Sequence, residues 1–494
     1  MFFYLFATAL TVATFAYAAV RGGRQGLWFG WLAAMLAMPT WIVFQLGSLA
    51  IDLRAVGGTL GLFVLLVFGD GETGPKRPLK LHPLALLADL MAIVLFATQV
   101  YTQKKIGRFG PLTAPDIARR WLLPYVIGRF YYGSVGDIRK SLPLTARMMM
   151  GLCVFAVFEG VTKFHPINKA LGKTYGILEA GEGYRWGLKR AQGPLDHPIF
   201  FGMMLVLLFP LVYEAYRVAK AGKGPKWWTR LLAAIGAAVF VTVSRGAQIS
   251  MILTGIMTLF FQKPKWRVAV LVFSVVGGGA GYVGKAVLTS MLSKLAEEKD
   301  DDIRLIMING EEYEYTGTNH RVLLFTAYDE ALRTTGYFGF GYELQGIELE
   351  EPVALRFSSI DDHYILFLLQ YGYVALTAFL ILAVVSIVNM GFLAWDVKGP
   401  KAAMAAALFG SLASVTVNLL SVWFSPDFGS VYLFCTGLAA NLRCLPDPIS
   451  IEPGGATAPS ARVLAASESS RLRPRLVAAH APVRSSVSYK KPSP

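Results

Sequence analysis

Long apolar stretches alternate with short polar connections along most of the chain. A helix needs about 20 apolar residues to cross a bilayer. By this measure we predict spans at residues 2–20, 27–44, 55–69, 84–100, 142–161, 198–218, 231–243, 247–261, 268–285, 364–388, 402–424 and 429–442. A further apolar piece, residues 121–133, contains a proline and an arginine, so it either spans or forms a broken, buried segment. The pattern predicts an all-α polytopic membrane protein with 12 or 13 transmembrane helices.

The composition supports this fold class. Of 494 residues, 54% are hydrophobic and 16% are charged, whereas a soluble domain carries roughly 25% charged residues. This excludes a disordered protein and disfavours a large soluble enzyme. The three cysteines lie in or beside apolar runs, so no disulfide framework or zinc pattern is expected. P-loop, HExxH and GxSxG motifs are absent from the sequence, which leaves ATPase, zinc protease and serine hydrolase functions without support.

The net charge of +15 is distributed unevenly. The connections at 217–230, 262–267 and 395–401 are rich in Lys, Arg and Trp, which places them in the cytoplasm by the positive-inside rule. The connection at 286–358 carries 14 acidic and six basic residues, a net charge of −8, and is predicted to be extracytoplasmic. The basic balance is therefore a topology signal and gives no case for nucleic acid.

These assignments divide the chain into four parts. Residues 1–285 form N-terminal transmembrane helices with an outer loop near 162–197, and residues 286–358 form the long periplasmic loop. Residues 359–442 form the C-terminal transmembrane helices. Residues 443–494, with eight basic and three acidic residues and much Pro, Ser and Ala, are predicted to be a disordered cytoplasmic tail. The N-terminus lies outside with 13 spans and inside with 12.

One arginine stands on the predicted outer side, against the positive-inside rule. Arg245 lies in the turn Ser244-Arg-Gly246 between two apolar stretches. Such an arginine either snorkels to the interface or binds an anion, for which Gly246 leaves backbone room and the following helix start adds a favourable dipole.

The long loop and its end hold further polar candidates. A helix is expected to begin near Asn319, and the run Gly336-Tyr-Phe-Gly-Phe-Gly341 follows it. This run is either a weak phosphate-binding signal or a tight packed turn. Its last two glycines permit positive φ or close backbone approach. The loop ends at Asp361-Asp362-His363, where a histidine beside carboxylates is either a general base with an orienting partner or a polar helix cap. His197 begins another span on the same side.

Three of these segments appear in the order and spacing of the O-antigen ligase and polysaccharide polymerase superfamily, which this chain resembles over roughly residues 129–442. They are Val243-Ser-Arg-Gly-Ala247, then Asn319-His-Arg321 leading to Gly339-Phe-Gly341, and then Asp362-His363-Tyr with Gly372 in the next span. The segment Asp196-His-Pro-Ile-Phe-Phe-Gly202 also resembles a recurrent family segment.

The resemblance implies a metal-independent glycosyltransferase without cofactors in the bacterial inner membrane. Its donor would be a glycan on undecaprenyl pyrophosphate and its acceptor a glycan or a lipid. Arg245 and Arg321 would bind the pyrophosphate, and His363 would activate the acceptor hydroxyl. His197, Arg129 and His320 are auxiliary candidates, and proteins of polysaccharide assembly and export are candidate partners.

Two departures affect the role of the histidine. The family usually has Asn directly after its His, whereas Tyr364 follows here and Asp362 precedes, so Asp361 or Asp362 is a candidate to share the role of His363. The second Gly of the family's GxxG is Ala375. The sequence leaves ligase and polymerase open. A flippase or transporter of lipid-linked glycan is the alternative, although no internal repeat is evident, and a membrane scaffold is a third reading.

Overall fold

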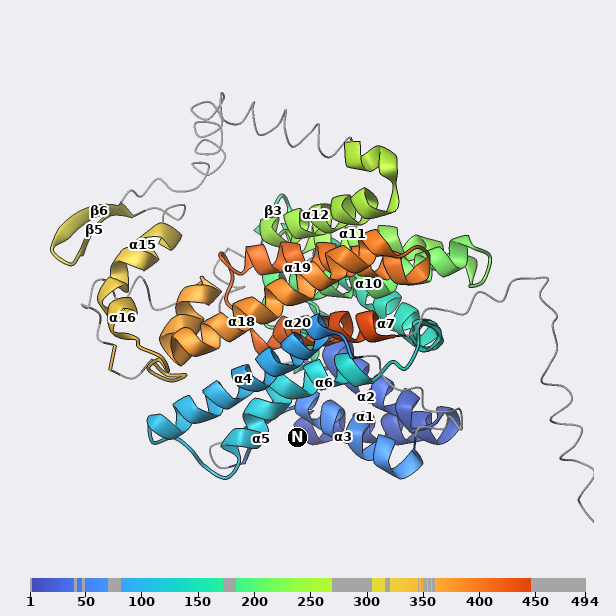
Figure 1. Cartoon of the computed structure of the whole chain (residues 1–494), viewed down its shortest axis with the longest axis horizontal. Coiled ribbons are helices and arrows are strands. Elements are labelled where there is room, and N and C mark those ends of the chain that lie inside the picture. Colours follow the sequence, from blue (N-terminus) through green and yellow to red (C-terminus); the bar gives the residue numbers. More distant parts are fainter. Residues whose placement is uncertain are drawn as a thin grey trace, which may run out of the picture. The chain divides into compact units, whose positions relative to one another are not determined.

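Apolar helices make up most of the part of the chain that can be described. The computed structural model describes residues 2–39, 42–46, 49–69, 81–171, 184–268, 304–315, 320–344 and 360–445, with isolated residues between 346 and 357. The elements are labelled in Figure 1. Residues 446–494, which include most of the predicted disordered tail, and nearly all of the predicted span 268–285 lie outside the described residues.

The first half of the described chain is helical apart from two short hairpins. Its main elements are α1 (Phe2–Arg21), α2 (Gly23–Ala37), β1 (Val43–Leu46), β2 (Leu49–Asp52), α3 (Leu53–Phe68), α4 (Pro83–Lys105), α5 (Thr113–Ile117), the π-helix η1 (Ala118–Leu122), α6 (Leu123–Phe130), α7 (Val135–Thr162), α8 (Pro166–Leu171), β3 (Tyr184–Arg185) and β4 (Leu188–Lys189).

The second half contains the longest helix and a third hairpin. Its main elements are α10 (Pro198–Lys220), the 3₁₀-helix η2 (Lys226–Arg230), α11 (Leu231–Val241), α12 (Arg245–Gln262), β5 (Arg304–Ile308), β6 (Glu311–Tyr315), α15 (His320–Ala327), α16 (Asp329–Thr334), α18 (His363–Asp396), α19 (Pro400–Asn418) and α20 (Pro426–Cys444). All three hairpins are antiparallel.

Six of the described helices are long and apolar enough to cross a membrane: α1, α4, α7, α10, α18 and α19. Helix α3 is apolar but shorter. Most of the candidate window of α10 is buried inside the protein, whereas little of that of α1 is. The prediction of an all-α polytopic membrane protein is confirmed, while the total of 12 or 13 spans stays a prediction.

Two predicted spans differ from the observed helices, and the segment at 121–133, predicted either to span or to be broken and buried, is divided between two short elements. The span at 27–44 is wrong in its second half, because α2 ends at Ala37 and residue 44 lies in β1. The span at 402–424 extends too far, because α19 ends at Asn418 and an apolar connection follows. Residues 121–133 begin in the π-helix turn η1 and continue in α6, with Pro124 tolerated in the first turn.

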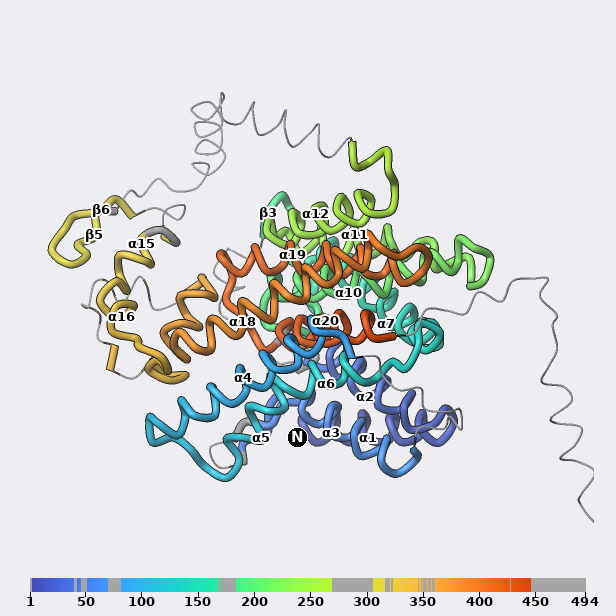
Figure 2. The backbone as a smooth tube through the Cα atoms, viewed as in Figure 1, coloured from blue at the N-terminus to red at the C-terminus, as the bar shows by residue number. Residues whose placement is uncertain are grey.

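Helix α18 is interrupted near its start. Gly372 has φ of 77° and ψ of −176°, values that lie outside the helical region. Residues 363–371 therefore form a short first segment of α18. A break within the apolar region leaves backbone groups that lipid cannot satisfy. The glycine-rich run at residues 336–341 satisfies them, and it can be followed beside the start of α18 in Figure 2.

The hydrogen bonds across this break form two pairs. The amides of Phe340 and Gly341 donate to the carbonyls of Leu369 and Gln370 at 2.8 and 2.9 Å. On the other side of the break, the amides of Tyr373 and Val374 donate to the carbonyls of Gly336 and Tyr337 at 3.3 and 3.2 Å. The amides of residues 340 and 341 are therefore occupied, and the run is a packed turn rather than a phosphate cradle.

The predicted freedom of the two glycines is confirmed. Gly339 and Gly341 have φ of 64° and 87°. A Cβ on Gly339 would lie 2.6 Å from the backbone of Gln370, and a Cβ on Gly372 would collide with the backbone of Tyr337. Side chains are excluded here both by conformation and by space.

We expect Gly372→Ala to destabilise the protein by about 2–4 kcal/mol, because it combines a positive φ with a backbone collision. The measurement is the fraction of detergent-purified protein that stays monodisperse after heating. Gly255→Ala is the control, since that α12 glycine has open space around it and alanine favours a helix. Equal melting of both variants would contradict the expectation.

Candidate functional site

The His363 side chain lies in an aromatic cage at the start of α18. Its ring centroid is 5.0 Å from those of Phe367 and Phe379 and 5.1 Å from that of Phe424, with which it stacks. The residue is only 2% exposed. Its backbone amide donates to the carbonyl of Leu419 at 2.9 Å, which ties the start of α18 to the connection between α19 and α20.

The two ring nitrogens of His363 have different surroundings. Nδ1 accepts the amide N–H of Phe424 at 3.4 Å, so the proton of a neutral ring resides on Nε2. Nε2 is buried and has no hydrogen-bond partner among the described residues. Because buried polar atoms are nearly always paired, this N–H is available to a group that enters the cage.

The carboxylate before His363 has a structural role. Asp362 is 3% exposed and caps α18, with its side chain accepting from the amides of Tyr364 and Ile365 at 2.8 and 3.1 Å. The helix-cap reading of this aspartate therefore holds. Asp361, the other candidate, is partly exposed immediately before it.

Arg245, predicted to lie in the turn before residue 247, is the first residue of α12. Its side chain is exposed and has no ion-pair or hydrogen-bond partner within the described part of the chain. The turn before it is strained: Val243 has φ of 48°, which is rare for a β-branched residue and is found where the surrounding structure imposes it. The structure thus holds an uncompensated guanidinium at a helix start.

The turn of Arg245 and the start of α18 meet at the end of α19. A Cβ on Gly246 would lie 2.7 Å from Oδ1 of Asn418, and the next residue, Leu419, accepts the amide of His363. Asn418 is fixed on both sides, since Nδ2 donates to Ser250 on α12 at 2.9 Å and Oδ1 accepts from Ser421 at 2.7 Å. Asn418 is therefore a positioning residue that sequence reasoning missed.

The segment around His197 joins the same cluster. A Cβ on Gly202 of α10 would collide with Ala247, two residues after Arg245. The ring of Phe200 lies 5.1 Å from that of Trp423, whose neighbour Phe424 stacks on His363. His197 itself caps α10, with Nδ1 accepting the amide of Ile199 at 3.1 Å.

A buried arginine approaches the Arg245 turn from the preceding hairpin. Arg190 is 6% exposed, and the amide of the next residue, Ala191, donates to the carbonyl of Val241 at the end of α11. Gln192 and Gly193 then donate their amides to the buried carboxylate of Glu159 on α7 at 3.2 and 3.0 Å. Sequence reasoning missed Arg190, although the pair Lys189-Arg190 just before a predicted outer helix start was a usable signal.

The two candidates on α15 lie on an element that packs against the other face of the α18 start. Leu323, Leu324 and Ala327 share a buried cluster with Ile365 and Leu369. Arg321 is the second residue of α15, and its side chain lies outside the described residues. His320 stacks on Phe357 with ring centroids 5.0 Å apart and bonds Tyr315 through Nδ1 at 3.1 Å, so it packs within the loop.

Arg129 is compensated inside the helix bundle. Its guanidinium is 2% exposed and pairs with Asp89 of α4, with Nε to Oδ1 at 3.0 Å and Nη2 to Oδ2 at 3.2 Å. Tyr125 donates to the same carboxylate at 2.6 Å. This arrangement joins α6 to α4, so the guanidinium of Arg129 is used in helix–helix packing.

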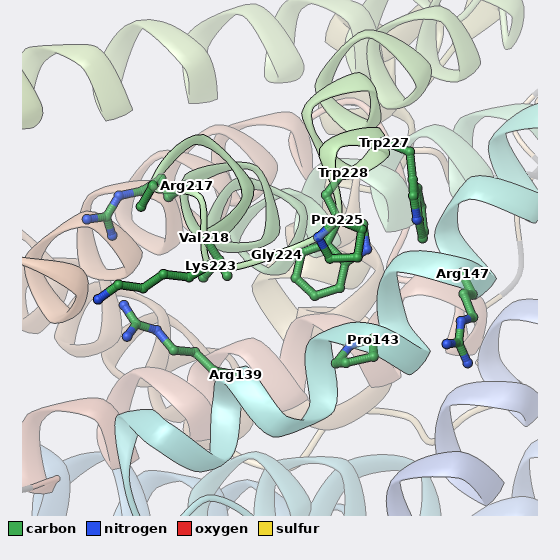
Figure 3. Close-up of a pocket in the computed structure, with 11 residues that line it drawn as sticks. Arg139, Pro143, Arg147, Arg217, Val218, Lys223, Gly224, Pro225, Trp227 and Trp228 are labelled. Carbon is green, nitrogen blue, oxygen red and sulfur yellow. The ribbon is translucent and has the colours of Figure 1, made fainter. Parts of the chain in front are cut away.

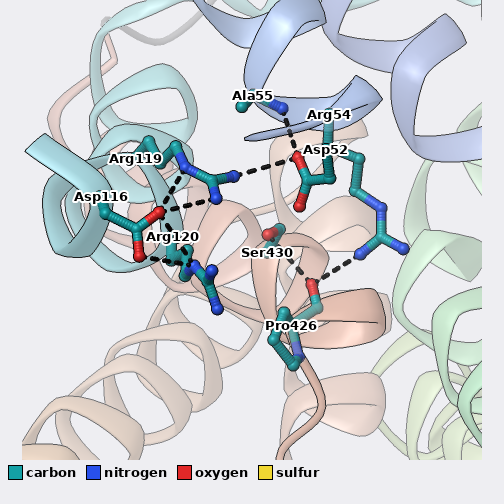
Figure 4. A network of polar contacts seen from close by, with 8 residues as sticks. All are labelled: Asp52, Arg54, Ala55, Asp116, Arg119, Arg120, Pro426 and Ser430. Carbon is teal, nitrogen blue, oxygen red and sulfur yellow. Dashed lines mark hydrogen bonds and ion pairs between the residues drawn. The ribbon is translucent and has the colours of Figure 1, made fainter. Parts of the chain in front are cut away.

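A second group of arginines lies at the start of the π-helix (Figure 4). Arg119 bridges Asp52 and Asp116, with Nη1 to Oδ1 of Asp52 at 3.0 Å and Nε to Oδ1 of Asp116 at 2.8 Å. Arg120 also pairs with Asp116 at 3.2 Å, and Arg54 donates to the carbonyl of Pro426 at 2.9 Å. The enclosed cavity is about 20 Å³, which holds roughly one water.

This network supports the aromatic cage. The residue after Arg120, Trp121, stacks on Phe424 with ring centroids 5.2 Å apart and contacts Phe367 at 5.3 Å. Burial raises the pKa of Asp52, but the charges of Arg119 and Arg54 outweigh it and hold that pKa below its ordinary value. The cluster thus pairs the carboxylates of Asp52 and Asp116 with the guanidinium groups of Arg119 and Arg120.

No family model matches the chain, and no curated protein sequence is significantly similar to it. Within the described residues, no group of three or more His, Cys, Asp and Glu side chains has an arrangement that holds a metal ion.

The cap of α10 gives a pH dependence. Burial first, and then the charges of Arg190 and Arg185, lower the pKa of His197 to about 4. In the unfolded chain this pKa is about 6.5, so stability is complete above pH 6.5 and is lost as the pH falls toward 4. We expect a loss of about 1–2 kcal/mol at pH 5 from this residue.

His197→Asn keeps a capping acceptor and removes the titration. We therefore expect the fall in melting temperature between pH 7.5 and pH 5 to be smaller in this variant than in the unaltered protein. The measurement is thermal unfolding in detergent at both values. Identical pH dependence in the two proteins would show that His197 does not titrate in this range.

Proposed function

We propose that this protein is a membrane glycosyltransferase of the O-antigen ligase or polysaccharide polymerase type, acting on undecaprenyl-pyrophosphate-linked glycan at the periplasmic face of the bacterial inner membrane. The observation that carries the proposal is the meeting of three helix starts. The first turns of α10 and α12 meet at Gly202 and Ala247. The end of α19 links them to the start of α18, because Asn418 lies against Gly246 and Leu419 accepts the amide of His363. These are three of the segments on which the resemblance depends.

The charges at this place suit a diphosphate. The unpaired guanidinium of Arg245 lies at a helix start, where amide groups and the helix dipole favour an anion. Guanidinium groups bind phosphate oxygens with two parallel hydrogen bonds. Arg321 is proposed as the second arginine, since α15 packs on the α18 start. Together they would stabilise the charge that develops on the leaving pyrophosphate.

In the proposed reaction the acceptor hydroxyl oxygen attacks the anomeric carbon on the face opposite the pyrophosphate. The carbon–oxygen bond to the pyrophosphate breaks, the electron pair leaves with undecaprenyl pyrophosphate, and the hydroxyl proton passes to His363. The anomeric configuration inverts. Because Nδ1 accepts the Phe424 amide, acceptance of the proton at Nε2 requires the other tautomer, with the Nδ1 proton directed to an acceptor.

Activity of substituted proteins tests this assignment. We expect Arg245→Ala and Arg321→Ala to lower polymer output about 100-fold, the usual cost of losing one transition-state donor. His363→Ala and His363→Gln should both lose activity by about this factor if the ring accepts a proton, whereas His363→Gln should remain active if the ring only donates a hydrogen bond. The measurement is glycan length and amount in cells, with protein levels checked by immunoblot.

Arg333→Ala is the matched control. This arginine lies in the same loop and is exposed, and among the described residues its ion-pair partner is Asp329, four residues earlier, at 2.8 Å. Its loss should therefore change output less than twofold. Full-length glycan in the Arg245, Arg321 and His363 variants alike would contradict the enzyme proposal.

A flippase of lipid-linked glycan is the second candidate, and the broken start of α18 is the observation that favours it. Transporters place substrate sites at interrupted helices. The two functions differ in the product. A transferase extends or moves the glycan of a purified lipid-linked donor, while a flippase leaves that glycan unchanged on its carrier.

A further inference from the structure

A basic pocket lies between α7 and the end of α10. The connection that follows α10 also lines it. Its volume is about 570 Å³, within the usual range for small-molecule sites. Figure 3 shows Arg139, Arg217 and Lys223 gathered on one side, with Arg147 and Trp227 on the other. This pocket belongs to the basic connection at 217–230, which the sequence places in the cytoplasm.

The pocket carries an excess of positive charge. Glu214 is buried and pairs with two of the four cations, Arg139 at 3.0 Å and Arg217 at 2.9 Å. The side chains of Lys223 and Arg147 are exposed and have no hydrogen-bond or ion-pair partner among the described residues. One carboxylate against four basic side chains leaves a net charge of +3, so an anion is the ligand that the pocket favours.

The remaining lining is apolar and aromatic. Pro143, Val218 and Ala221 contribute apolar surface beside the two tryptophans. Trp228 is 4% exposed, and its indole N–H is buried without an acceptor in the part of the chain that the structure describes. A buried donor without an acceptor is rare in proteins. A ligand that fits must therefore combine negative charge, hydrogen-bond acceptors and apolar surface.

We propose that this pocket binds the headgroup of an anionic phospholipid. The phosphate oxygens would bind Lys223, on the side where Arg139 and Arg217 gather, and the glycerol end would extend across Pro143 and the tryptophans toward Arg147. Basic pockets between transmembrane helices on the cytoplasmic side bind anionic headgroups, and tryptophans concentrate at membrane interfaces. The site is separate from the proposed transferase site and would anchor the α7–α10 contact to the lipid surface.

The test is a lipid titration of the full-length protein in detergent by native mass spectrometry, with phosphatidylglycerol as the probe. The double variant Arg147→Gln with Lys223→Gln removes two unpaired charges and should weaken phosphatidylglycerol binding about tenfold. The control Lys226→Gln with Arg230→Gln removes the same charge from the same connection outside the pocket lining. The affinity of this control variant for phosphatidylglycerol should change less than twofold.

Two further probes identify the source of the phosphate. Phosphatidylcholine should bind much more weakly than phosphatidylglycerol, and free glycerol 3-phosphate should not displace the lipid at equal concentration. Equal loss of binding in both double variants would overturn the site, because the effect would then be one of general charge. Equal binding of phosphatidylcholine, or displacement by glycerol 3-phosphate, would overturn the anionic lipid as its occupant.

Discussion

The hydrogen bonds that close the break in α18 are the constraint on which the candidate site depends. A helix interrupted in an apolar environment must find partners for its freed amides and carbonyls, and the run at residues 336–341 supplies four of them. The glycines make this close contact feasible, because the backbones meet where a Cβ on Gly339 or Gly372 would collide. The loop and the helix are therefore fixed to each other by main-chain contacts.

Because the break is fixed, residues 363–371 form a separate short helix with two faces. One face places His363 and Phe367 in the aromatic cage, and the other buries Ile365 and Leu369 against α15. A loop helix and a transmembrane connection are thereby linked through one short segment.

Much of the fold could be predicted from the sequence, because helix-length apolar stretches and turn residues are local signals. Helix starts were expected at residue 247 and near Asn319, and α12 and α15 begin at Arg245 and His320. The positive φ of Gly339 and Gly341, which the sequence analysis allowed, is also found. The partner of the glycine-rich run could not be predicted, since its contacts with residues 369–374 are set by tertiary packing. Residues 402–424 are continuously apolar, so the sequence did not show that α19 ends at Asn418. Asn418 itself is the residue that positions this connection against α12.

The pairing of the arginines separates those that hold helices together from those available to a ligand. Arg129 and Arg119 are compensated by buried or half-buried carboxylates on other elements, and removing such a charge from water requires this compensation. Arg245 at one helix start and Arg147 in the basic pocket have no such partner among the described residues. The sequence alone cannot distinguish the paired from the unpaired arginines, since both kinds lie in apolar stretches. The distinction depends on which carboxylates the fold brings near, and that is a property of the tertiary structure that the sequence pattern does not show.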